Sequence, residues 1–173
     1  RQGGEKTKYI LVQGGEYYLD RSRFEIDVDV FESSLANAYT APGIESIRWY
    51  EQAVTIYEGE YLNNLLYYDW VIPERRRLQA AYLNALSELA GCYASQGQFD
   101  QAILLLDKSI QMDSLNEDSY CDVMRYYAEQ GDIAAMVQQY QKLEDVLRDE
   151  LNLQPSAIGQ QLYRHLLSQL KRD

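Results

Sequence analysis

The sequence predicts an all-α fold built of antiparallel helix pairs, with a short β-hairpin at its N-terminal end. Three observations support this prediction. Apolar residues recur at helical spacing along most of the chain, one segment repeats with a fixed period, and β-prone runs are confined to the first 24 positions. The chain has 173 residues, of which 46% are hydrophobic and 25% charged, as in ordinary globular proteins. A chain of this length buries enough surface to fold without a metal or a disulfide.

The internal repeat is the strongest of these observations. The segment YASQGQF at 93–99 recurs as YAEQGDI at 127–133, which is a shift of 34 residues. The shift aligns Gly97 with Gly131, and the apolar positions on both sides of this glycine keep the same register. A 34-residue period of two amphipathic helices around a turn is typical of the tetratricopeptide repeat, in which stacked helix pairs bury each other's apolar faces.

The first 24 residues are expected to form a different element. The runs KYILV and EYYL are β-prone and lie on either side of Gly14-Gly15, which predicts a hairpin. Five of the sixteen Lys and Arg residues lie within the first 23 positions. The sequence therefore predicts a small basic β element attached to an acidic helical body.

The helices are placed by apolar spacing, proline and glycine positions, and capping residues. Pro73 suits the first turn of a long helix that runs to about Ser95. Asn116 is expected to cap one later helix, and Ser156, next to Pro155, is expected to cap the last. The predicted helices are 28–39, 44–57, 73–95, 99–112, 116–130, 133–149 and 156–170, and the repeats are clearest at 83–116 and 117–150.

Composition and charge argue against several functional classes. No apolar run approaches the 18 or so residues that span a bilayer, and the polar start RQGGEKTK is no secretory signal. The formal net charge of −11 makes it unfavourable for the helical body to bind nucleic acid by itself. We therefore expect a cytoplasmic protein with no membrane contact. Because the chain begins with Arg rather than Met, we also expect it to be a piece of a longer protein.

No constellation of residues predicts catalysis, a cofactor or a metal. GGEKT at 3–7 lacks the G-x-x-x-x-G-K-[ST] spacing of a phosphate loop. His165 is the only histidine and is expected near a surface, while Cys92 and Cys121 are expected to be small buried hydrophobes. Paired carboxylates are frequent, but on helix faces they are usually solvated. We therefore predict that the protein is not an enzyme and needs no cofactor.

A concave groove is expected along the first helices of the repeats, because these helices line the inner surface of a stacked array. The inward positions are small or polar, which fits a groove that receives a peptide or a helix. The expected groove residues are Asn84, Ser87, Gly91, Asp118, Cys121, Asp122 and Arg125. The alternatives are a solvated surface or a groove filled by the chain's own last helix.

The aromatic-rich segment 57–70 is a second candidate for an interface, because interfaces favour Tyr and Trp. It contains Tyr57, Tyr61, Tyr67, Tyr68 and Trp70. The alternative is that these side chains pack between helices, which is the expected role of Trp70. The neighbouring run Arg75–Arg77 fans around a helix, so its side chains cannot all face one ligand. It is therefore expected to lay its alkyl stems over apolar surface, to pair with the acidic body or to dock against a winged helix, rather than to bind DNA.

Three separated segments resemble the bacterial transcriptional activator domain of the streptomyces antibiotic regulatory proteins and their relatives. They are RFEIDVDVFESSL at 23–35, DWVIPERRRLQAAYLNALSELA at 69–90 and DELNLQPSAIGQQLYRHLL at 149–167. In that family an all-helical, tetratricopeptide-like domain follows an OmpR-type winged-helix DNA-binding domain. Asn152 stands where the family usually has glycine, and asparagine also tolerates positive φ.

The resemblance also implies a domain division and a function. YILVQGGEYYLD resembles the last wing hairpin of the winged helix, which assigns residues 1–24 to the end of that domain or a linker and 25–173 to the activator domain. It implies a regulatory domain that associates with itself or contacts RNA polymerase or its own winged helix. DNA would be bound only through the missing N-terminal domain, with Lys6 and Lys8 as candidate phosphate-backbone contacts. The alternative function is a free-standing tetratricopeptide scaffold that binds a peptide or a protein.

Overall fold

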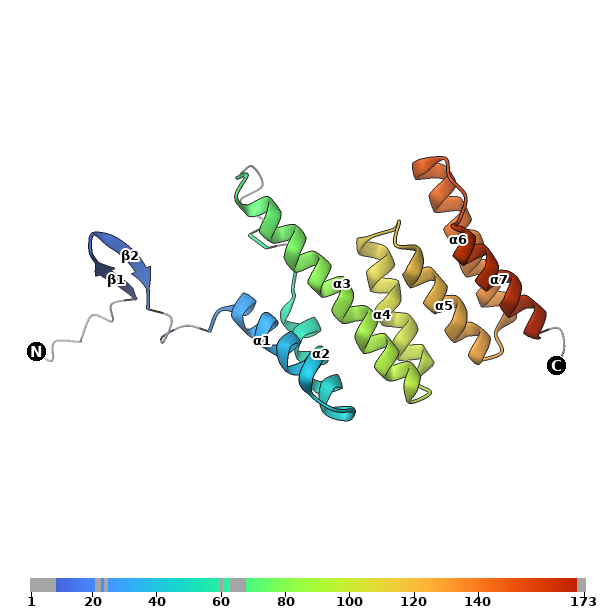
Figure 1. Ribbon diagram of the computed structural model, residues 1–173, viewed down its shortest axis with the longest axis horizontal. Helices are drawn as coiled ribbons and strands as arrows, with labels where there is room; N and C mark the ends of the chain where they lie inside the picture. The colour runs from blue at the N-terminus through green and yellow to red at the C-terminus, as the bar shows by residue number, and fades with distance from the viewer. Residues whose placement is uncertain (1–8, 21–22, 24, 60, 63–67, 171–173) are drawn as a thin grey trace, which may run out of the picture.

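The structure is a computed structural model that describes residues 9–20, 23, 25–59, 61–62 and 68–170. Within this part of the chain a two-stranded hairpin precedes seven helices (Figure 1). The elements are β1 (Ile10–Gln13), β2 (Glu16–Leu19), α1 (Asp27–Thr40), α2 (Ile44–Ile56), α3 (Val71–Ser95), α4 (Phe99–Met112), α5 (Glu117–Glu129), α6 (Ile133–Leu151) and α7 (Ala157–Leu170). The predicted all-α fold with a short N-terminal hairpin is confirmed.

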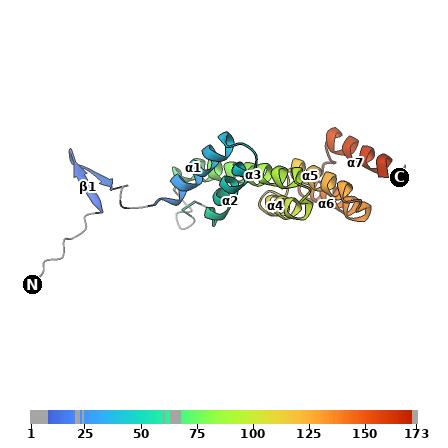
Figure 2. The ribbon, with the colours of Figure 1, turned by 90° about the horizontal axis from the view of Figure 1, so that it is seen from below.

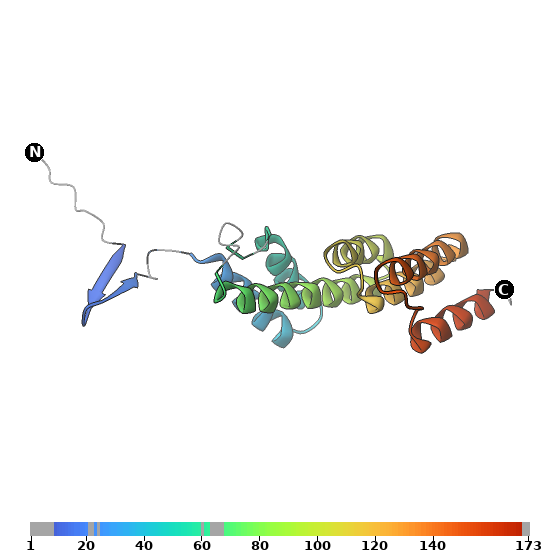
Figure 3. The ribbon, with the colours of Figure 1, turned by 90° about the horizontal axis from the view of Figure 1, so that it is seen from above.

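The helices stack as antiparallel pairs in two layers. The odd-numbered helices α1, α3, α5 and α7 lie in one layer, and α2, α4 and α6 lie in the other (Figures 2 and 3). Each helix packs against its predecessor, and α7 packs mainly against α5, the preceding helix of its own layer. This is the arrangement expected of tetratricopeptide-like repeats, since each pair buries its apolar face against the next.

The long helix α3 joins the first helix pair to the repeats. Its 25 residues carry buried apolar side chains along two different stretches. Leu78 and Leu86 pack with Phe31 of α1, whereas Ala90 packs with residues of α4 and α5. One continuous helix therefore holds the N-terminal pair and the repeat array in a fixed relation.

The turns of the two repeats have the same backbone geometry. Gly97 has a φ of 73° and Gly131 a φ of 74°. The residue after each glycine donates its N–H to the carbonyl five positions earlier, at 3.0 Å after Gly97 and 2.9 Å after Gly131. These bonds form the Schellman motif, in which a left-handed residue closes a helix. The helices that follow begin at Phe99 and Ile133, so the predicted repeat is present in the backbone.

Three predicted helix ends are also found. The Asn116 side chain accepts a hydrogen bond from the Ser119 N–H at 3.4 Å, and the Ser156 hydroxyl accepts one from the Gly159 N–H at 3.2 Å. Asn152 ends α6 with a φ of 54°, which is the conformation expected where glycine usually stands. Local capping chemistry therefore sets these boundaries.

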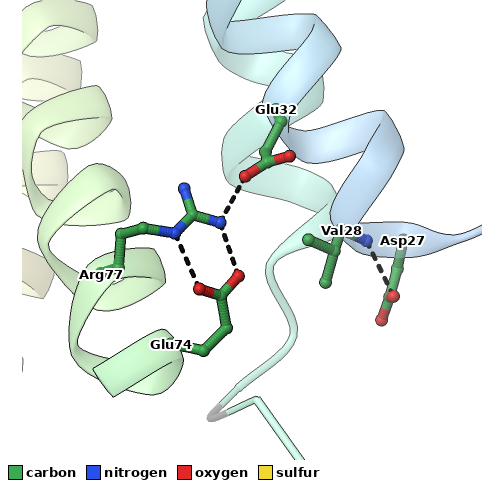
Figure 4. A network of polar contacts seen from close by, with 5 residues as sticks. All are labelled: Asp27, Val28, Glu32, Glu74 and Arg77. Carbon is green, nitrogen blue, oxygen red and sulfur yellow. Dashed lines mark hydrogen bonds and ion pairs between the residues drawn. The ribbon is translucent and has the colours of Figure 1, made fainter. Parts of the chain in front are cut away.

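Arg77 connects α3 to α1 (Figure 4). Its guanidinium donates to Glu74 of the same helix, with Nε 2.9 Å from Oε2, and its Nη2 also contacts Glu32 of α1. For Arg77, pairing with acidic residues is therefore the alternative that the structure shows. The side chains are about half exposed, so the pair orients the two helices more than it stabilises them.

The hairpin is antiparallel, with Ile10 opposite Leu19 and the turn at Gly14-Gly15. In the ribbon views it lies apart from the helices (Figure 1). The domain boundary between residues 24 and 25, and the assignment of the hairpin to a winged helix, stay predictions.

Candidate functional site

The layer of odd-numbered helices, which was expected to line the inner surface, presents a polar row on α3. Asn84, Ser87 and Gly91 are all exposed. The opposite side of this helix is packed, with Leu86 fully buried and Leu89 2% exposed. Because the helix repeats every 3.6 residues, burial of one face leaves the other facing away from the core.

The corresponding row on α5 is charged. Asp118 is exposed, and Asp122 forms an ion pair with Arg125 three positions later. Their side chains are 28% and 49% exposed. Exposed ion pairs of this kind contribute little to stability. The three residues are therefore available for contacts outside the helix at small cost to the fold.

Cys121 lies in the same row but is closed off by α7. It is 5% exposed and packs with Leu166 in a buried cluster. A Cβ placed on Gly159 of α7 would lie 3.8 Å from the Cys121 sulfur. Burial raises the pKa of the Cys121 thiol to about 11. Its placement in an open groove was wrong, because at this position the chain's own last helix covers α5. The separate expectation that Cys121 is a small buried hydrophobe is confirmed.

Glu117 anchors the N-terminal end of α7. Its Oε2 accepts a hydrogen bond from the Ser156 N–H at 2.9 Å. The same oxygen lies 3.4 Å from the position of a Cβ on Gly159, so the absence of a side chain there permits the close approach. The sequence indicated only an acidic first turn for α5. No local pattern links Glu117 to a residue 39 positions away.

The aromatic segment divides into packed and exposed residues. Tyr57 stacks on Tyr82 with the ring centroids 4.1 Å apart, and Tyr61 is half-buried. Tyr68 and Trp70 are 55% and 62% exposed. The expectation that Trp70 packs between helices is therefore wrong, because most of this residue, which precedes α3, is exposed. Tyr67 lies outside the described residues.

A cleft opens beside the first turn of α1. Its volume is about 530 Å³, and its walls include Phe31, Tyr57, Tyr61, Leu62 and Leu78. Arg75 of α3 donates Nε to the Tyr61 carbonyl and Nη2 to the Leu62 carbonyl, both at 3.1 Å. Leu62 has a φ of 48°, a strained value for a leucine. Arg75 thus fixes the loop that forms one wall of the cleft.

Among the described residues no group of three or more His, Cys, Asp or Glu is placed to hold a metal ion. His165 is exposed, as expected, and Cys92 is only partly buried. In the same residues no helix is both long and apolar enough to cross a bilayer. Lys6 and Lys8 lie outside the described part of the chain.

Comparison with known proteins finds relatives among transcriptional regulators. Two curated relatives are 27% identical over 169 residues, the transcriptional regulatory protein MoaR1 of Mycobacterium bovis and that of Mycobacterium tuberculosis. The match covers 98% of this chain and 53% of each relative, so the chain spans about half their length.

Two solved structures share the architecture. Mycobacterium tuberculosis EmbR, solved with a low-affinity phosphopeptide, matches with a TM-score of 0.71 at 16% identity, over 93% of this chain and 44% of EmbR. The C-terminal TPR-containing domain of a Plasmodium falciparum protein, assigned as FK506-binding, matches with a TM-score of 0.53 at 15% identity, over 90% and 95% of the two chains. At these identities the likeness shows the fold alone.

The family model described as the bacterial transcriptional activator domain matches residues 19–167. This range includes all seven helices except the last residues of α7. The family and the tetratricopeptide-like fold together point to a regulatory helical domain with a non-enzymatic role. This chain belongs to the bacterial transcriptional activator domain family.

Proposed function

We propose that the helical array is the interaction domain of a DNA-binding transcriptional regulator, and that its inner face contacts a protein partner. The partner is a second copy, RNA polymerase or the regulator's own winged helix. DNA is bound through the N-terminal domain, and the protein acts in the cytoplasm. The family match and the regulator relatives support this role. A free-standing scaffold has no comparable support, because the likeness to a TPR-containing domain concerns the fold alone.

The observation that carries the proposal is the polar row across α3 and α5. It consists of Asn84, Ser87, Asp118, Asp122 and Arg125. All five are exposed or half-exposed on helices whose opposite faces supply the core, so packing does not require them. Arginine is among the residues on which binding energy concentrates in protein interfaces. A partner that binds along this row would gain contacts without disturbing the stack.

The test is the double substitution Asp122→Ala and Arg125→Ala in the full-length protein. We expect promoter binding to survive and activated transcription to fall at least about tenfold, as the loss of one interface hot spot would cause. The matched control is Asp145→Ala with Arg148→Ala on α6. That pair has the same residue types and spacing, but lies in the other layer.

The outcomes separate the candidate surfaces. Loss of activation in the α5 variant alone, with unchanged DNA binding and thermal stability, supports the proposal. A second variant, with Tyr67→Ala and Tyr68→Ala, tests the aromatic segment. If activation survives in both variants, neither the polar row nor the aromatic segment carries the interaction.

The double substitution Lys6→Ala and Lys8→Ala tests a different part of the proposal. It should weaken promoter binding and reduce the salt dependence of that binding, if these lysines contact phosphates.

A further inference from the structure

The cleft beside α1 has the size and the lining of a small-molecule site. Its volume of about 530 Å³ lies within the range of about 300–1,000 Å³ that is usual for ligand pockets. Phe31 and Leu78 belong to its lining although they are only 3% and 2% exposed, so the cleft reaches the packed residues of α1 and α3. Half-buried Tyr57 and Tyr61 also line it. A ligand in this cleft would therefore lose contact with water and gain contact with apolar and aromatic side chains.

The aromatic residues of the cleft are held in place by contacts within the protein. The Tyr57 ring stacks on Tyr82, and its centroid lies 5.7 Å from that of Phe31 with the two ring planes at 50°. Arg75 fixes the segment around Tyr61 through backbone carbonyl groups, so this contact does not depend on the Tyr61 ring. A site that is ordered before binding loses less conformational entropy when a ligand enters.

The charges around the cleft favour a cation. Among the described residues that line it, Asp27 and Glu58 are acidic and exposed, and none is basic. The neighbouring arginines of α3 are already engaged, Arg75 by the loop carbonyls and Arg77 by two glutamates (Figure 4). Carboxylates beside a cleft attract cations and repel anions. Aromatic rings attract cations as well, through the negative potential of their faces.

We propose that the cleft beside α1 binds a small organic cation, a substituted ammonium group carried on an apolar body. The ammonium group lies between the aromatic rings and the carboxylates of Asp27 and Glu58, and the apolar body contacts Phe31 and Leu78. Such a ligand would contact α1, α3 and the segment between α2 and α3 at once. None of these residues belongs to the polar row on α3 and α5, so the proposal does not depend on the interaction role.

A series of three ligands that share one aromatic ring tests the preference for a positive charge. Benzyltrimethylammonium is a cation, benzyl alcohol is neutral and phenylacetate is an anion. Each is titrated into the ¹⁵N-labelled natural chain, and the amide shifts of Val28, Tyr61 and Leu62 are followed by NMR. We expect the cation to bind at least about tenfold more tightly than benzyl alcohol, and phenylacetate to bind most weakly.

Three outcomes of this titration would overturn the proposal. The first is equal affinity for the cation and benzyl alcohol, which would show that the cleft selects only for apolar character. The second is a set of shifted amides that lies away from the cleft. The third is the absence of any shift at about 10 mM cation, an affinity too weak for a built site.

Removal of the two carboxylates tests their part in the site. Asp27→Asn with Glu58→Gln should weaken binding of benzyltrimethylammonium about tenfold and leave benzyl alcohol binding unchanged, because the substitutions keep the shape of the side chains. The matched control is Glu144→Gln with Asp145→Asn, which removes the same two charges from α6 at the other end of the array (Figure 1). Equal weakening in both variants would show that net charge, and not the cleft, attracts the cation.

The aromatic contribution is tested at Tyr61. Tyr61→Leu should weaken binding of the cation at least about threefold, because it removes a ring that attracts the ammonium group. Tyr61→Phe keeps the ring and should bind the cation as the natural chain does. The Arg75 contacts remain in both variants, since they involve backbone carbonyl groups. Unchanged cation binding by Tyr61→Leu would contradict the proposed position of the ammonium group.

Discussion

Leu89 illustrates how one side chain can hold two helix pairs together. It is 2% exposed and packs with Ala38 of α1, with Ile47 and Tyr50 of α2, and with partly buried residues of its own helix. Leu89→Ala should lower the free energy of unfolding by about 2–5 kcal/mol, because it removes buried methyl groups and leaves a cavity. Urea denaturation measures the change. Leu104→Ala, at a 63% exposed position, is the control, and equal effects of the two would show that Leu89 is not a core residue.

A second prediction at the residue scale concerns three glycines, where alanine should lower the stability at two positions and raise it at the third. Gly97 and Gly131 have positive φ, so alanine at either position should cost about 1–2 kcal/mol. Gly91 lies within α3, and a Cβ there would meet nothing within 4 Å. Gly91→Ala should therefore raise stability by about 0.5–1 kcal/mol, since alanine favours helix interiors. Thermal melts of the three variants measure these changes in stability. A destabilising effect of Gly91→Ala would contradict the description of α3.

The attachment of α7 is a property of elements rather than of single residues. α7 closes the array, and the contact between Glu117 and the Ser156 N–H ties its first turn to α5. Glu117→Ala should cost about 0.5–2 kcal/mol, as the loss of a capping group does. Hydrogen exchange should accelerate in α7 and remain unchanged in α3. Asp118→Ala, one position along and exposed, is the matched control, and similar acceleration in both variants would argue against the anchoring role.

The contact between α2 and α3 should depend on pH. The Tyr93 hydroxyl donates a hydrogen bond to Glu51 of α2, and this bond, with burial and the charge of Glu51, raises the pKa of Tyr93 from 10.0 to about 12. Because the pKa of Tyr93 is higher in the folded state than in the unfolded state, its protonated hydroxyl contributes to the free energy of unfolding. This contribution is fully present below pH 10. That contribution is lost as the pH rises towards 12.

Tyr93→Phe removes this source of alkaline sensitivity. The free energy of unfolding of the natural chain should fall more steeply between pH 10 and pH 12 than that of Tyr93→Phe. Denaturation curves collected across this interval measure the difference. Parallel pH profiles for the two proteins would show that the hydrogen bond does not couple α2 to α3.

At the scale of the whole molecule, charge limits what the array binds. The formal net charge is −11, and acidic residues outnumber basic ones in the repeats as well. We expect this chain to bind mixed-sequence duplex DNA more weakly than about 10 μM at physiological salt, because affinity for DNA depends on neutralising phosphates. Fluorescence anisotropy measures the binding, and a sub-micromolar dissociation constant would contradict the prediction.

The sequence by itself determined the helices and their ends. Apolar spacing located all seven helices within a few residues, and the glycine alignment located both repeat turns. Asn116, Asn152 and Ser156 end or begin helices as expected. These features depend on interactions within about one helical turn of the chain, so the local sequence contains the information they require. The exposed row on α3 and α5 was equally predictable, because periodicity separates its positions from the core.

Only the tertiary structure decided which of these surfaces remain open. Cys121 has the same helical spacing as its exposed neighbours, yet α7 covers it, and this contact joins residues about 40 positions apart. Trp70 looked like a core residue by composition and is exposed. Arg75 reaches back to the carbonyl groups of Tyr61 and Leu62, two residues that line the cleft beside α1. Such contacts depend on how helices cross and where loops return, and no local periodicity encodes those geometries.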